Sequence, residues 1–347
     1  MTKKEKIKKF DPNGIGDTAN TIFGLPFTSD EAEVIVIPVP WEVTVSYSAG
    51  TANGPKAVYD ASFQVDLFDA NIKSAWHKGI FMDEIPSQIQ KQSNTLRKKA
   101  EKYISLLESG KNYSENSEMA AIRKEINTAC EKLNFWVKEK SLHFMQKNKT
   151  VALLGGDHST PLGLMQALSE KNKNFGILHI DAHADLRDAY EGFEFSHASI
   201  MFNALKIKQI SKLVQVGIRD YCEAEAQLIE NSKGRVKTFF DRDLKKRSFN
   251  GETWKKICLE IVATLPEKIY LSFDIDGLDP KLCPNTGTPV AGGFEFEQAL
   301  FLIETVIASG KKIIAFDINE VTPGKDEWDA NVGARLLYRI ANLVAHQ

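Results

Sequence analysis

Three apolar runs in this sequence each end in acidic residues or histidines, and this pattern restricts the fold more than any other feature. The polar endings are Asp157-His158, Asp181-Ala-His183-Ala-Asp185 and Asp274-Ile-Asp276. In a β-strand, alternate residues point to the same side, so the polar residues of each ending can converge. In an open parallel sheet, ligands bind outside the carboxyl ends of the strands. The pattern therefore predicts a parallel α/β sheet with a polar site at that edge.

Strand-like and helix-like segments alternate from Thr150 onward, which supports this interpretation. Apolar runs typical of strands occupy 151–154, 175–180, 213–217, 236–240, 268–274 and 313–318. Helical spacing occurs near 160–171, 222–232, 252–264, 295–309 and 333–345. This alternation predicts right-handed βαβ units and a mostly parallel sheet.

The first 150 residues are less regular. Residues 1–32 are polar and are expected to form an N-terminal arm on a single domain of residues 33–347. The run 34–39 predicts a buried strand. Residues 86–148 are rich in charged and amide side chains with helical spacing, which predicts two amphipathic helices joined by a loop at 109–116.

Composition excludes several classes of protein. A formal net charge of −2 disfavours a nucleic-acid surface. The four cysteines are widely spaced, which disfavours a disulfide framework or a zinc cluster. No run approaches the ~18 apolar residues of a membrane span, and the basic N-terminus lacks the apolar stretch of a secretory signal. We therefore expect a cytoplasmic enzyme that contacts neither membrane nor nucleic acid.

The converging side chains suit metal ions better than a single general acid–base pair. Six candidate ligands, four of them carboxylates, are His158, Asp181, His183, Asp185, Asp274 and Asp276. One ion rarely needs four carboxylates, whereas two ions can share bridging carboxylates. Carboxylate and imidazole ligands suit Mn²⁺, with Ni²⁺, Co²⁺ and Zn²⁺ as alternatives. Each acidic residue alone could also cap a helix or begin a turn.

Two further residues are candidates for catalysis. His197 lies in a polar loop beyond the second ligand group and can move protons near neutral pH. Glu320 follows the run 313–318 and can attract a cationic substrate. The competing interpretation of His197 is a surface or helix-capping histidine, and that of Glu320 is a helix cap or an ion pair. Asp317 and His179 precede strand ends and are expected to support the ligands from behind.

Four motifs together resemble the ureohydrolase family, which includes arginases, agmatinases, formiminoglutamases and guanidino-acid hydrolases. The motifs are Gly155-Gly-Asp-His-Ser159, Asp181-Ala-His-Ala-Asp185, Ser272-Phe-Asp-Ile-Asp-Gly-Leu-Asp-Pro280 and Asp317-Ile-Asn-Glu-Val-Thr-Pro323. The resemblance implies a three-layer α/β/α fold and two Mn²⁺ ions per chain held by the six candidate ligands. It also implies that His197 shuttles protons and that Glu320 binds the guanidinium group. We further expect a homo-oligomer, a trimer or a hexamer. The segment 86–148 is longer than in the shorter family members.

The resemblance implies hydrolysis of a guanidino compound to urea and an amine, and the sequence favours agmatine as the substrate. The loop 186–197 carries Asp188, Glu191 and Glu194 against a single Arg187, and an acidic rim suits an ammonium tail better than a carboxylate. Arginine and other guanidino compounds remain alternatives. A metal-dependent deacetylase-like amidohydrolase and a non-catalytic binding protein are the alternatives from other classes.

Overall fold

All eight strands join one sheet in the order β2-β1-β3-β8-β7-β4-β5-β6, within the residues that the computed structural model describes, 1–109 and 117–347. Every neighbouring pair is parallel. The strands are β1 (Val34–Val39), β2 (Ile80–Met82), β3 (Thr150–Gly155), β4 (Phe175–Ile180), β5 (Ile210–Ile218), β6 (Val236–Phe240), β7 (Lys268–Asp274) and β8 (Lys312–Asn319). The predicted parallel α/β architecture is confirmed.

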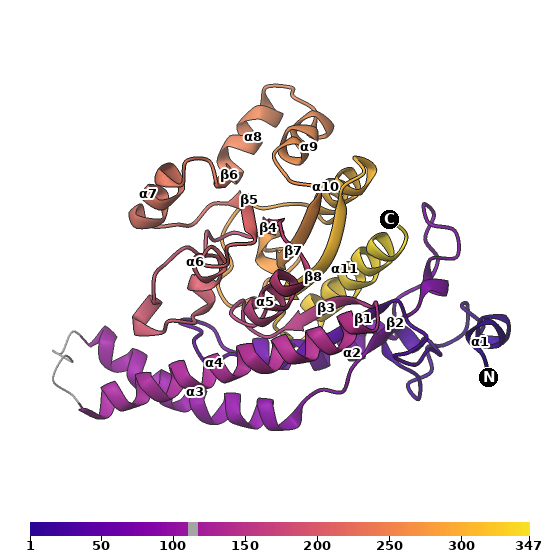
Figure 1. Cartoon of the computed structure of the whole chain (residues 1–347), viewed down its shortest axis with the longest axis horizontal. Coiled ribbons are helices and arrows are strands. Elements are labelled where there is room, and N and C mark those ends of the chain that lie inside the picture. Colours follow the sequence, from indigo (N-terminus) through magenta and orange to yellow (C-terminus); the bar gives the residue numbers. More distant parts are fainter. Residues whose placement is uncertain (110–116) are drawn as a thin grey trace.

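Helices cover both faces of this sheet (Figure 1). The helices of the described residues are α1 (Lys3–Lys9), α2 (Gly54–Ser62), α3 (Ser87–Glu108), α4 (Ser117–Gln146), α5 (Leu162–Lys171), α6 (Ile200–Ala204), α7 (Glu223–Asn231), α8 (Asp241–Phe249), α9 (Trp254–Ala263), α10 (Phe296–Ala308) and α11 (Trp328–Ala345). Helix α1 lies at the periphery of the molecule, away from the sheet (Figure 1). On one side α11 packs against α2 and α10, while α4 packs against α5 on the other. The result is the three-layer α/β/α arrangement expected from the sequence.

The central strands owe their position to their apolar side chains. Every residue of β1 and β4 is buried, as is every residue of β7 after Lys268. Strands that helices cover on both faces read as continuous rather than alternating apolar runs. The strands β1, β4 and β7 could therefore be predicted from their continuous apolar sequence.

Elements with weak apolar signals were missed. The edge strand β2 has only three residues, and α8 is strongly polar and buries only Asp241 and Leu244. The N-terminal segment contains α1 and packs on the body through Phe10 against Trp76 and Phe23 against Tyr338. The boundary between arm and domain at residue 32 stays a prediction.

The predicted helical segment is a hairpin of two long helices, α3 and α4, that run side by side (Figure 1). The predicted loop between them lies, apart from Ser109, outside the described residues. Among the residues described, no helix is both long and apolar enough to cross a bilayer, and all four cysteines are free.

Candidate metal centre

Four adjacent strands in the middle of the sheet bring the predicted site residues to one edge. His158 follows β3, Asp181 follows β4, Asp274 ends β7 and Glu320 follows β8. The register aligns these ends, because Asp274 lies opposite Asn319 and Ile180 lies opposite Phe273. The carboxyl ends of parallel strands thus gather residues that are up to 162 positions apart in the chain.

His158 faces three carboxylates with its Nδ1 atom. Nδ1 lies 3.0 Å from Asp181 Oδ2, 3.1 Å from Asp274 Oδ2 and 3.4 Å from Asp185 Oδ2. The other ring nitrogen, Nε2, lies 2.9 Å from Ser272 Oγ. Nδ1 is buried and has no hydrogen-bond partner among the described residues. A buried polar atom that faces several anionic oxygens fits a shared cation at their centre.

Asp181 connects two groups of possible ligands. One group contains His158, His179, Asp181 and Asp185, and the other contains Asp181, His183 and Asp276. The Oδ2 atom of Asp181 faces His158, while its Oδ1 atom lies 3.5 Å from His183 Nδ1. His183 Nδ1 also lies 3.0 Å from Asp276 Oδ2. A carboxylate whose two oxygens face two ligand groups has the arrangement of a bridge between two ions.

The electrostatics of the cluster also fit cations. Burial and neighbouring carboxylates raise the pKa values of Asp185 and Asp274 well above the usual range. Desolvation alone would lower the pKa of His158, but the carboxylates of Asp181 and Asp274 raise it well above normal. Among the described residues, no lysine or arginine forms an ion pair with the four ligand carboxylates. The negative charge that is concentrated here suits divalent ions with oxygen and imidazole ligands.

Buried polar residues support the ligands from behind. Gln215 Nε2 donates to His179 Nδ1 at 3.1 Å, which leaves the protonated Nε2 of His179 to donate to Asp181 Oδ2 at 2.7 Å. Behind His158, the hydroxyl of Ser272 donates to Asp317 Oδ1 at 3.1 Å. Such contacts fix the orientation of metal ligands. The sequence had suggested His179 and Asp317 for this role but not Gln215, a lone amide in the apolar run 213–217.

Glu320 is 6% exposed and lies next to the cluster. Its Oε1 atom accepts a hydrogen bond from the backbone N–H of His158 at 2.8 Å. Burial raises its pKa well above the usual range, and the nearby Asp274 raises it further. Glu320 and Asp185 both adopt left-handed backbone conformations, with φ of 62° and 53°. Such conformations cost about 1–3 kcal/mol in residues other than glycine and cluster at functional sites.

His197 lines the same cavity as Glu320 and lies in the loop that follows the second ligand group. Its backbone N–H donates to Thr44 Oγ1 at 3.3 Å. Desolvation lowers its pKa to about 3, and the neighbouring His183 and His158 act in the same direction. The lowered pKa keeps the imidazole neutral near pH 7.

A cavity of about 140 Å³ joins these residues. Its walls include the predicted residues His158, His183, Asp185, His197, Asp274 and Glu320. They also include Ser46, Arg187, Tyr190, Ala198, Asp220, Tyr221, Glu225 and Thr288. Of these, Arg187 and Tyr190 belong to the loop 186–197 that the sequence had indicated for the substrate tail. A larger cavity of about 570 Å³, beside β2, contains none of the predicted site residues.

The structure does not bring the three predicted tail-binding carboxylates into this cavity. Asp188 and Glu194 are exposed and Glu191 is partly buried, and none of the three belongs to the cavity walls. Burial raises the pKa of Glu191, and the nearby charges of Glu108 and Arg97 also act on it, which places its carboxyl group toward α3. Their role in substrate binding stays a prediction.

Comparison with known proteins identifies the family of this chain. The sequence matches the arginase family over residues 32–342. The N(1)-aminopropylagmatine ureohydrolase of Thermus thermophilus is 29% identical over 314 residues, which cover 90% of this chain and 91% of that protein. The agmatinase of Neisseria meningitidis is 33% identical over 202 residues, which cover 56% of this chain and 61% of the relative.

Solved structures have the same fold. The agmatine ureohydrolase of Thermoplasma volcanium superimposes with a TM-score of 0.69 at 22% identity and covers 98% of this chain and 97% of its own. The arginase of Medicago truncatula gives a TM-score of 0.66 at 23% identity, with 90% and 87% of the two chains covered. Since the family match spans the whole sheet and every candidate ligand, the chain belongs to the arginase family.

Proposed function

We propose that this chain hydrolyses the guanidino group of a small guanidino amine to urea and an amine, with agmatine, which yields putrescine, as the expected substrate. One observation carries the proposal: buried Glu320 and the histidine–aspartate cluster line the same cavity. The carboxylate can hold a guanidinium ion at the point where the cluster can hold divalent ions.

Two Mn²⁺ ions would be held by six residues, with Ni²⁺, Co²⁺ and Zn²⁺ as alternatives. His158, Asp185 and Asp274 would hold one ion, His183 and Asp276 would hold the other, and Asp181 lies in both ligand groups. When bound, two divalent ions supply Lewis acidity and lower the pKa of water toward neutrality.

Two other side chains act on the substrate itself. Glu320 accepts the N–H groups of the guanidinium in a charge-assisted contact, with Oε2 as the oxygen that His158 N–H leaves available. This pairing orients the guanidinium carbon toward the cluster. Neutral His197 accepts a proton during attack and returns it to the nitrogen of the leaving amine, which cannot depart as an amide anion.

The tail of the substrate would lie toward Asp220 and Tyr221, which are exposed at the cavity wall. Both carboxylate oxygens of Glu225 accept backbone hydrogen bonds, from Leu186 at 2.9 Å and Cys222 at 2.8 Å, so Asp220 is the carboxylate better placed for an ammonium group. The relatives favour an amine tail, because one is an N(1)-aminopropylagmatine ureohydrolase and another is an agmatinase.

Arg187 supports a second candidate, a guanidino acid or arginine. It lines the cavity and could pair with a carboxylate. However, its guanidinium stacks on Tyr190 at 4.7 Å and its Nε lies 3.9 Å from Glu225, so part of its charge is already balanced. A guanidinobutyrase of Pseudomonas aeruginosa is 34% identical over 196 residues, so a guanidino acid is included among the substrates to be tested.

Urea release by the Mn²⁺-loaded protein tests the proposal with four substrates: agmatine, N1-aminopropylagmatine, arginine and 4-guanidinobutyrate. We expect kcat/KM for agmatine to exceed that for arginine by at least ~10-fold, which requires about 1.4 kcal/mol of discrimination. Asp220→Asn should lower the ratio of agmatine to arginine kcat/KM if Asp220 binds the ammonium group of agmatine. The double variant Glu191→Gln with Glu194→Gln should lower the same ratio if the loop 186–197 binds that group. A preference for arginine would contradict the amine-tail assignment, and no urea from any substrate would contradict the proposed function.

A further inference from the structure

The cavity is walled by two chain segments, residues 41–52 and 186–198, that both rest on the α3–α4 hairpin. The first segment supplies Ser46, and the second supplies Arg187, Tyr190 and His197. Neither segment contains a regular helix of more than three residues, so their positions depend on contacts with the rest of the chain.

Arg97 of α3 holds the first segment. It is 8% exposed, and its guanidinium donates to the carbonyl oxygens of Val43, at 3.5 Å, and of Val45. Its Nε atom pairs with Glu101 one turn further along the helix, at 3.1 Å. A single guanidinium nitrogen of Arg97, Nη1, thus connects α3 to the two carbonyl groups on either side of Thr44.

A second contact from α3 holds the same segment. The backbone N–H of Glu42 donates to Ser93 Oγ at 3.0 Å. The carboxylate of Glu42 in turn accepts hydrogen bonds from the backbone N–H groups of Gly50, at 2.6 Å, and Ala52, at 3.1 Å. The loop is therefore closed on itself and attached to the helix at its base.

Asn127 of α4 holds the second segment. Its side-chain amide donates to the carbonyl oxygen of Gly192 at 3.3 Å, and its side-chain oxygen accepts the N–H of Glu194 at 3.0 Å. Between these two contacts, the ring of Phe193 packs on Tyr103 of α3 at 5.1 Å. One side chain thus pairs with a donor and an acceptor of a turn that includes left-handed Gly192.

The two segments meet at His197. Its backbone N–H donates to Thr44 Oγ1, and Thr44 lies between the two residues whose carbonyls Arg97 binds. The backbone of His197 is consequently connected to the hairpin through Thr44 on one side and through the Gly192 turn on the other.

We propose that the hairpin positions the cavity walls and that Arg97 and Asn127 are its positioning residues. They touch neither the ligand cluster nor the cavity, and they act through Thr44 and His197 and through the Gly192 turn. The inference rests on the proposed function for its kinetic consequence only, because the ordering of the two segments can be measured without substrate.

Arg97→Met tests the first contact, with Lys98→Met at the neighbouring exposed position as the matched control. In the Arg97 variant, hydrogen exchange should rise ~5- to 10-fold in residues 43–50 and 196–198, as expected for the loss of one net hydrogen bond, and stay unchanged in β3 and β7. Metal content should equal that of the wild type. kcat should fall ~10- to 100-fold, since a misplacement of about 1 Å can cost ~10²-fold, while KM changes much less. Arg97→Lys, which keeps the charge, should recover part of kcat.

Asn127→Leu tests the second contact with a side chain of similar size, and Asn94→Leu at an exposed position of α3 is its control. Exchange should rise in residues 190–195 while metal content and the exchange of the central strands stay at wild-type values. Wild-type exchange in both wall segments, or faster exchange throughout the sheet, would overturn the proposal. If the wild type releases no urea, the proposed function fails, but the exchange and metal measurements still decide whether the hairpin orders the walls. If Arg97→Met does not fold, Asn127→Leu carries the same test.

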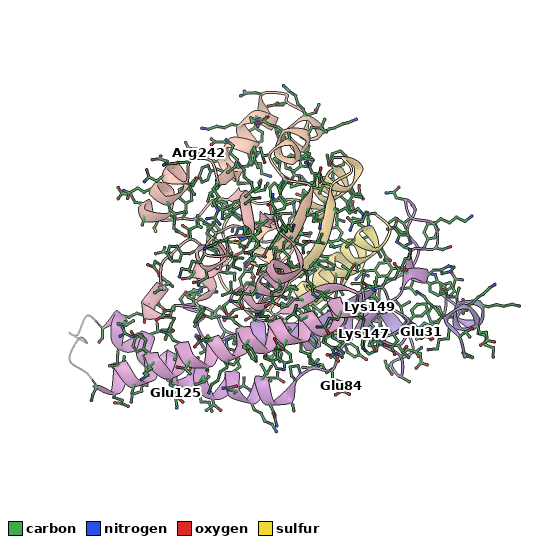
Figure 2. The ribbon with its side chains drawn as sticks, in the orientation of Figure 1. Glu31, Glu84, Glu125, Lys147, Lys149 and Arg242 are labelled. Atoms are coloured by element: carbon green, nitrogen blue, oxygen red, sulfur yellow. The ribbon has the colours of Figure 1, made fainter. Side chains whose placement is uncertain are left out.

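The hairpin also carries ion pairs that face away from the cavity and that the proposal does not need. Lys99 pairs with Glu125 across the two helices at 2.6 Å, and Figure 2 shows Glu125 on the outer side of the hairpin. Both side chains are about half exposed, and exposed pairs contribute ~0–1 kcal/mol. Lys99→Met should therefore leave exchange in both wall segments unchanged, which separates the hairpin's surface from its buried contacts.

Discussion

At the scale of single residues, His158 links the two halves of the site. Its Nδ1 atom faces the carboxylate cluster, and its backbone N–H binds Glu320. Its Nε2 atom rests on Ser272, whose hydroxyl donates to buried Asp317. Because one residue touches the ligand cluster and the carboxylate proposed to bind guanidinium, the distance between these two parts is fixed by the β3–α5 turn.

His197→Ala should lower kcat by ~10²–10⁴-fold, the usual contribution of general acid–base catalysis. Metal content measured by elemental analysis should remain that of the wild type, because His197 belongs to neither ligand group. Loss of metal in this variant would make His197 a ligand, and unchanged turnover would remove it from the mechanism.

Glu320→Gln should lower kcat/KM for every guanidino substrate by ~10- to 100-fold, since hydrogen bonds to charged groups contribute about 1.5–3 kcal/mol. The glutamine oxygen can still accept the His158 N–H, so the melting temperature should change little. Glu223→Gln, on the exposed first turn of α7, is the control. A loss confined to one substrate would place Glu320 at the tail instead of the guanidinium.

At the scale of elements, the polar strand ends could be identified from the sequence because each follows a continuous apolar run. The runs 175–180, 236–240 and 268–274 match the strands to the residue. The presence of turns after the strands could be predicted from the sequence, but their conformation could not. That Gly156 must lack a side chain follows only from the tertiary contact that brings Trp41 beside it.

Gly156→Ala should destabilise the protein by about 1–3 kcal/mol or more, because a Cβ atom there would lie 1.9 Å from the carbonyl oxygen of Trp41. Thermal or denaturant unfolding measures the loss. Gly14→Ala is the control, since its added Cβ would meet only ordinary contacts of 3.5 Å or more. Equal stabilities of the two variants would show that the turn can shift to accommodate a methyl group.

At the scale of the whole molecule, the sequence predicted the sheet edge at which the candidate ligands gather, but not most of the other residues that line the cavity. The ligands share one sheet edge, so strand ends alone indicated that they converge. The cavity wall, by contrast, combines residues such as Ser46, Tyr190 and Asp220, which come from separate loops. Their convergence depends on the strand order and on the α3–α4 hairpin, and neither can be predicted from a local sequence pattern. The three carboxylates of the loop 188–194 are not among the residues that line the cavity, and their role in binding the substrate tail stays a prediction.

The charge balance of the whole site leads to a prediction about metal removal. Four buried carboxylates without lysine or arginine partners among the described residues repel one another when no cation is bound, so divalent ions should stabilise the fold. At a free Mn²⁺ concentration 100 times its Kd, binding contributes about 2.7 kcal/mol for each site that the unfolded chain lacks. We expect about two Mn²⁺ per chain by elemental analysis and a lower Tm after chelation. Asp185→Asn should reduce the gain in Tm on adding Mn²⁺, because it removes one anionic ligand, and should change the Tm of the metal-free protein much less, because burial and the neighbouring Asp181 already raise the pKa of Asp185. Asp188→Asn, exposed in the next loop, should change neither value. A single tightly bound ion, or a metal-free protein as stable as the loaded one, would contradict the two-metal centre.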